Sequence, residues 1–156
     1  MDFIDSFPEA IDIPKAIHSD RHNIALANWW DTPETRFKQI DGTHSSTIPD
    51  ITTWYCSCLV LSPRASRLLG PLLEKYGELL AVQVHHECCY IFNCLVTKKL
   101  EGEIDFDKQH SVLSPDLLRP LVFKDPSKAL DVLICDDIFE DLLKEYDLEG
   151  LTLEQK

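Results

Sequence analysis

The chain of 156 residues is 44% hydrophobic and 27% charged, and its formal net charge is −12. A chain of this size and composition is typical of one globular domain that buries its own core. It contains only five glycines, and no apolar run approaches the ~18 residues that a membrane-spanning helix needs. The composition therefore argues against a glycine-rich phosphate loop and against a membrane protein.

The negative charge is concentrated at the two ends of the chain. Residues 1–50 hold nine acidic and four basic residues (−5), residues 51–129 hold nine of each (0), and residues 130–156 hold nine acidic and two basic residues (−7). Such a field repels nucleic acid and anionic membranes, and it speeds the encounter with a basic protein. We therefore expect a protein partner with a basic surface, and neither nucleic acid nor a membrane.

The first residues, Met-Asp-Phe-Ile-Asp, lack the basic start and apolar middle of a signal peptide. We expect a cytoplasmic protein whose six cysteines are reduced thiols. Residues 1–50 are punctuated by four prolines, so a long helix is expected there only between Pro14 and Pro33. We expect this segment to be an N-terminal extension packed on a core formed by residues 51–156, in one domain overall.

Two adjacent tryptophans, Trp29 and Trp30, stand out in the N-terminal segment. On a strand, neighbouring side chains point to opposite faces, so both cannot point inward. Because exposed tryptophan often marks an interaction surface, one of the two is a candidate partner contact.

Residues 54–61 are aromatic, β-branched and apolar, which predicts a strand that leads directly into a helix. Ser62 is a good N-cap, and Pro63 suits the first helical position. Gly70-Pro71 predicts a break or kink followed by a second short piece that ends at Tyr76, with Gly77 as the helix stop.

The second half of the core alternates strands with turns. Residues 79–84 and 89–96 predict an antiparallel pair joined by a hairpin loop over 85–88, and further strands are expected at 121–123 and 130–135. The fold class is therefore α+β, with a mixed, largely antiparallel sheet and helices packed on it.

The last predicted helix follows Asp136, which is its N-cap, and runs from Asp137 to Tyr146. Acids in its first turn complement the positive helix N-terminus. Its expected inward face is Ile138, Leu142, Leu143 and Tyr146, and its expected wet face is Glu140, Asp141, Lys144 and Glu145.

The hairpin sequence is the sharpest candidate for chemistry, because histidine and cysteine are zinc ligands. The residues are His85, His86, Glu87, Cys88 and Cys89, with Cys94 and the Cys56/Cys58 pair as possible neighbours. However, the chain has no C-x-x-C pattern, and adjacent Cys88 and Cys89 would point in opposite directions on a regular strand. A metal- or thiol-dependent enzyme that uses the hairpin stays an alternative, but we expect neither a cofactor nor a catalytic site.

From residue 54 onward, the order of segments resembles a bacterial immunity-protein family. The resemblance rests on these segments: Leu59-Val60-Leu61-Ser62-Pro63-Arg64-Ala65-Ser66-Arg67-Leu68-Leu69, Leu79-Leu80-Ala81-Val82-Gln83-Val84, Tyr90-Ile91-Phe92-Asn93-Cys94-Leu95, Leu133-Ile134-Cys135-Asp136 and Leu148-Glu149-Gly150-Leu151-Thr152-Leu153. The family is the eleventh class of immunity proteins catalogued with polymorphic toxin systems, typified by a myxobacterial member. The resemblance covers residues 54–153.

This resemblance implies a non-enzymatic protein that neutralises a cognate toxin in the producer's cytoplasm, where such toxins are often delivered by type VI secretion. The expected contact surface combines the acidic terminal helix with an exposed tryptophan. Its residues are Asp136, Asp137, Glu140, Asp141, Glu145 and one of Trp29 and Trp30. A homodimer is left open, as is the alternative of a secretion-system adaptor or chaperone that also binds a partner without chemistry.

Overall fold

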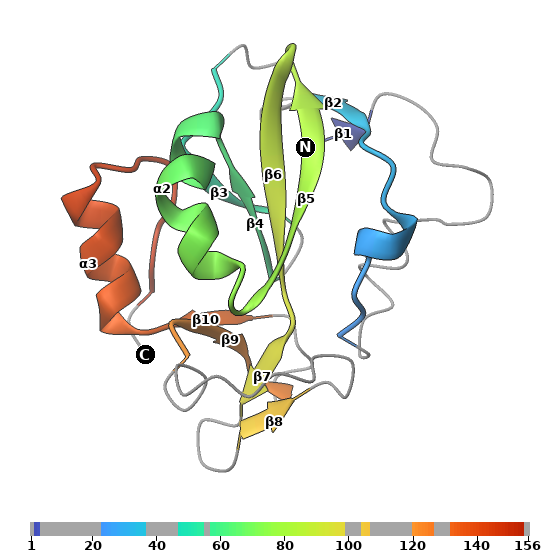
Figure 1. The fold of residues 1–156 in the computed structure, drawn as a ribbon. Helices are drawn as coiled ribbons and strands as arrows, with labels where there is room; N and C mark the ends of the chain where they lie inside the picture. The colour runs from blue at the N-terminus through green and yellow to red at the C-terminus, as the bar shows by residue number, and fades with distance from the viewer. Residues whose placement is uncertain are drawn as a thin grey trace.

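The computed structural model describes residues 2–3, 23–36, 47–54, 57–98, 104–106, 120–126 and 132–154. Within these ranges, two sheets and two α-helices form an α+β domain, which confirms the predicted fold class (Figure 1). The elements are β1 (Asp2–Phe3), η1 (Ala27–Trp29), β2 (Glu34–Arg36), β3 (Ile51–Trp54), β4 (Cys58–Leu61), α2 (Pro63–Leu73), β5 (Gly77–Val84), β6 (Glu87–Cys94), β7 (Val96–Lys98), β8 (Ile104–Phe106), β9 (Val122–Lys124), β10 (Leu133–Cys135) and α3 (Asp137–Glu145).

Both sheets are mixed and largely antiparallel. The larger has the strand order β1-β2-β5-β6-β4-β3 and the smaller has the order β10-β9-β7-β8. Among the described strand pairs, β2–β5 and β7–β9 are parallel and the others are antiparallel. Strand β6 continues through Leu95 into β7, so one stretch of chain serves both sheets (Figure 1). The backbone N–H groups of Leu95 and Val96 both donate to the Tyr76 carbonyl, at 2.9 and 3.3 Å, which holds this crossing.

Successive side chains along each strand point to opposite faces of the larger sheet, and this divides the core into two apolar layers. Phe92 packs in the layer that includes α2, α3 and the smaller sheet, whereas its neighbour Ile91 packs on the opposite face of the larger sheet. Leu59 and Val60 of β4 are divided in the same way. Both faces of these central strands are therefore covered, which explains their continuous apolar runs.

The predicted single strand over residues 54–61 is wrong. Trp54 and Cys58 face each other as cross-strand partners, so the chain turns between them and β3 and β4 form an antiparallel hairpin. A run of apolar residues does not distinguish one strand from two when both faces are buried. Cys56 lies outside the described residues. The predicted entry into the helix is confirmed, because the Ser62 hydroxyl accepts a hydrogen bond from the Ala65 N–H at 3.1 Å.

Of the break or kink predicted at Gly70-Pro71, the break is wrong, because α2 continues through Pro71 and ends at Leu73, before the predicted end at Tyr76. Pro71 lacks one helical N–H, but the Glu74 N–H donates to the Gly70 carbonyl at 2.9 Å and so completes the last turn. The fully buried Leu69 and Leu73 lie on either side of the proline. Their burial, at roughly 1.5–3 kcal/mol each, offsets a proline cost of about 3 kcal/mol.

Gly77 begins β5 instead of ending a helix in the left-handed conformation. A Cβ atom at this position would lie 2.1 Å from the Asn93 carbonyl oxygen, so glycine is needed for close contact between β5 and β6. The hairpin between these strands is also tighter than predicted. Its loop is His85-His86 alone, both at positive φ (49° and 71°), which matches a two-residue turn of the primed type.

In the described part of the chain, neither helix is long and apolar enough to cross a membrane.

Candidate functional site

The strongest candidate for a partner-binding surface is α3. Asp136 caps the helix by accepting a hydrogen bond from the Ile138 N–H at 3.2 Å, as predicted. Phe139 is 1% exposed and Leu143 is 7% exposed, and both pack into the core layer that contains α2. The prediction that Ile138 faces inward is wrong, because its side chain is 60% exposed. A residue one position from Phe139 is rotated by about 100° around the helix, and the larger Phe139 takes the buried position.

Three exposed carboxylates follow one another along α3 at intervals of four residues, namely Asp137, Asp141 and Glu145. We call them the acidic row. Residues spaced by four lie on the same side of a helix, so the row runs along one side of α3 and Ile138 lies beside it. The other acid of the helix, Glu140, accepts a hydrogen bond from Lys144 Nζ at 2.6 Å, and this contact raises the pKa of Lys144. Lys144 is the one basic residue of α3, and it is bonded to Glu140 while the charge of Asp141 also raises its pKa, so the helix carries four acids against one base.

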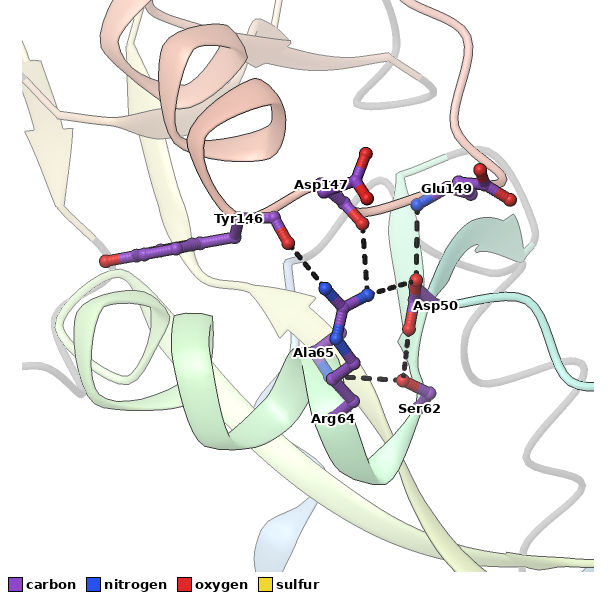
Figure 2. A network of polar contacts seen from close by, with 7 residues as sticks. All are labelled: Asp50, Ser62, Arg64, Ala65, Tyr146, Asp147 and Glu149. Atoms are coloured by element: carbon purple, nitrogen blue, oxygen red, sulfur yellow. Dashed lines mark hydrogen bonds and ion pairs between the residues drawn. The ribbon is translucent and has the colours of Figure 1, made fainter.

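The C-terminal end of α3 is fastened to the N-terminal turn of α2 by a polar clamp (Figure 2). Arg64 Nη1 donates to Asp50 Oδ2 at 2.8 Å and to the Asp147 carbonyl at 3.0 Å, and Nη2 donates to the Tyr146 carbonyl at 2.7 Å. A cation at these carbonyls also complements the negative end of the helix dipole. The guanidinium therefore ties the C-terminal end of α3 to α2 and to Asp50.

Asp50 completes the clamp from the segment that precedes β3. Besides binding Arg64, it accepts hydrogen bonds from the Ser62 hydroxyl and from the Glu149 N–H, both at 3.3 Å (Figure 2). Sequence reasoning missed Asp50 and Arg64 because 14 residues separate them, and only the β3–β4 hairpin brings them together.

Trp30 lies far from α3. Its indole Nε1 donates to the Ala81 carbonyl at 2.7 Å, and its ring packs on the core layer opposite to that of Phe139. Figure 1 shows α3 and the η1 segment on opposite sides of the larger sheet. The structure thus gathers the predicted acids on one helix but does not join Trp30 to them. The Trp29 side chain is not among the described ones.

The His85–Cys89 hairpin separates its two thiols. Cys88 is exposed and Cys89 is completely buried, because adjacent strand residues point to opposite faces. Burial, followed by the nearby Glu87 charge, raises the pKa of Cys89 to about 11. This thiol therefore stays protonated at neutral pH and is a poor nucleophile. Within the described ranges, no three or more His, Cys, Asp or Glu side chains gather closely enough to hold a metal ion.

A buried polar cluster lies where β6 crosses into the smaller sheet. Lys124 Nζ of β9 donates to Asn23 Oδ1 at 3.1 Å and to Asn93 Oδ1 at 3.3 Å. Asn93 Nδ2 donates to Glu78 Oε1 at 2.8 Å. We call Lys124, Asn93, Asn23 and Glu78 the Lys124 cluster. Its members are far apart in sequence. The sequence pattern that could have indicated the cluster is a polar residue within an apolar strand, as at Asn93 and Lys124.

Comparison with protein-family models, curated proteins and solved structures finds no match to this chain.

Proposed function

We propose that the chain is an immunity protein that binds and neutralises a cognate antibacterial toxin in the cytoplasm of the producing cell, without catalysing a reaction. The observation that carries this proposal is α3, which presents the acidic row and the exposed Ile138 on a helix that is capped at its N-terminus and fastened to α2 at its C-terminus. The resemblance of residues 54–153 to an immunity-protein family supports the same function.

The geometry of α3 suits inhibition by tight binding. The acidic row would attract a basic toxin surface and raise the association rate. Ile138 would supply an apolar contact at the centre of the interface, where buried side chains set the dissociation rate. The Asp136 cap and the Arg64 clamp hold the helix before binding, so little conformational entropy is lost when the partner docks.

The proposal is tested with the protein encoded by the neighbouring gene, purified and titrated with this chain. The test variant replaces the acidic row (Asp137→Asn, Asp141→Asn and Glu145→Gln). The matched control makes the same charge change at three exposed acids elsewhere (Asp31→Asn, Glu34→Gln and Glu74→Gln). We expect the test variant to lower the association rate by roughly tenfold or more at low salt, and the control to lower it much less.

Three outcomes contradict the proposal. If the neighbouring protein does not bind, the function is wrong. If it binds but its toxicity is unaffected, the chain is an adaptor or chaperone. If the two charge variants weaken binding equally, α3 is not the contact surface and only the net charge matters.

A further inference from the structure

We propose that Lys124 and Asn93 become joined by an intramolecular amide bond between their side chains. The two residues are 31 positions apart and lie on β9 and β6, and Lys124 Nζ is 3.3 Å from Asn93 Oδ1. The carboxamide carbon lies about 1.2 Å behind that oxygen, so a small movement of the lysine side chain brings the amine onto the carbon. Such preorganisation of two reacting groups supplies much of the barrier reduction in an intramolecular reaction.

The burial of the pair favours the reaction. Lys124 and Asn93 are each 5% exposed, and the described hydrogen-bond partners of Lys124 Nζ are two neutral amide oxygens. A buried ammonium is costly when the groups around it are neutral. Amide formation replaces this charge with a neutral group, so the cross-linked product avoids the unfavourable free energy of burying a charge.

Glu78 occupies the position of a proton carrier. Its Oε1 accepts a hydrogen bond from Asn93 Nδ2 at 2.8 Å, the nitrogen that must leave. The carboxylate is itself oriented by the backbone N–H groups of Leu26 and Ala27, at 2.6 and 3.0 Å. Once the lysine nitrogen is bonded to Asn93 Cγ, it lies on the same carbon as Nδ2, so the carboxylate that contacts Nδ2 can pass protons from one nitrogen to the other.

The step balances without any added reagent. The Lys124 ammonium gives up two protons in all as its nitrogen forms a bond to Asn93 Cγ, and the bond between Cγ and Nδ2 then breaks as Nδ2 takes up those two protons. The leaving nitrogen departs as ammonium, which carries the positive charge that Lys124 had. No oxidant, reductant or co-reactant is consumed, and the cross-link would form whether or not the chain binds a toxin.

Asn93 is a better acceptor than Asn23, although Lys124 contacts both. Both side-chain nitrogens donate to a backbone carbonyl, Asn23 Nδ2 to Leu95 at 2.6 Å and Asn93 Nδ2 to Ile24 at 3.0 Å, but a carbonyl oxygen cannot take up and return a proton as a carboxylate can. Only Asn93 has Glu78 beside its leaving group. The expected bond therefore ties β6 to β9, across the two sheets.

The test is the intact mass of the full chain, purified and denatured, followed by tryptic peptide mapping. We expect the wild type to be lighter than its sequence by one ammonia, with cleavage after Lys124 blocked and the peptides that contain Asn93 and Lys124 joined. Lys124→Arg and Asn93→Ala should restore the full mass, and Glu78→Gln should lower the cross-linked fraction at least tenfold in freshly made protein. Lys98→Arg serves as the control that keeps the cross-link.

A wild-type chain at its full sequence mass overturns the proposal, and this result does not depend on whether any variant folds. Loss of ammonia that persists in Lys124→Arg would mean cyclisation of an asparagine onto its own backbone, which also overturns it. Joined peptides that contain Asn23 instead of Asn93 would contradict the role of Glu78. Circular dichroism of each variant establishes that a restored mass comes from a folded chain.

Discussion

Replacing Arg64 with alanine should loosen α3 while leaving the rest of the fold in place. The substitution removes an ion pair with Asp50 and two hydrogen bonds to the carbonyls of Tyr146 and Asp147. The Arg64 side chain is 46% exposed, so its ion pair contributes only about 0–1 kcal/mol. The two hydrogen bonds add about 1 kcal/mol together, if each makes a net contribution to stability at the lower end of the usual range. We expect a loss of about 1.5 kcal/mol in the free energy of unfolding.

For a chain of this length, that loss lowers the melting temperature by about 3–6 °C. Urea denaturation followed by circular dichroism measures the free energy, and hydrogen exchange followed by mass spectrometry shows where the loss falls. Exchange should speed up in residues 137–149 and stay unchanged in β5 and β6. Arg64→Lys should lose about half as much, because a single ammonium keeps the ion pair but cannot reach all three acceptors.

The matched control is Arg67→Ala, at an exposed position on the same helix, which should change stability by less than about 0.5 kcal/mol. If Arg64→Ala and Arg67→Ala have the same effect on stability and on exchange in α3, the clamp does not hold the helix and the reasoning from its geometry is wrong.

Three further experiments test the packing. Phe139→Ala should lower the free energy of unfolding by about 3–5 kcal/mol, whereas Ile138→Ala should lower it by less than about 0.5 kcal/mol. Similar losses would contradict the orientation of α3, in which Phe139 is buried and Ile138 is exposed. Gly77→Ala should prevent native folding, seen as loss of near-ultraviolet circular dichroism, because its Cβ would lie 2.1 Å from a backbone oxygen of β6. The pKa of Cys89 and of Cys94 is about 11 in the folded chain, against 9.0 for an unperturbed thiol. Unfolded thiols therefore ionise first, and the free energy of unfolding should fall as pH rises from 9 to 11. A smaller fall in a Cys94→Ala variant would identify the buried thiol as one cause. The same fall in wild type and variant would contradict a role for this thiol.

The parts of the fold that the sequence predicted well are those set by local chemistry. Ser62 and Asp136 cap their helices as expected, because a short polar side chain before an apolar helical stripe needs no tertiary information. The β5–β6 pair was predicted from two apolar runs on either side of a polar turn. The prediction failed for Trp54, since a run buried on both faces gives no alternation to show where the chain reverses.

The parts that could not be predicted depend on contacts between distant segments. Asp50 reaches Arg64 only after β3 and β4 have paired. Lys124 reaches Asn23 across 101 positions. Ile138 looked like a core residue because hydrophobicity alone does not decide which of two adjacent apolar residues is buried. The packing of Phe139 into the core layer that contains α2 decides it.

The central claim, that this chain neutralises a toxin by binding it, is tested most directly by growth of bacteria that express the neighbouring gene. We predict that this gene stops growth when expressed alone, that co-expression of the wild-type chain restores growth, and that the variant lacking the acidic row of α3 restores it poorly at equal protein level. A neighbouring gene that is harmless alone, or a toxin that kills equally in the presence of this chain, would contradict the claim.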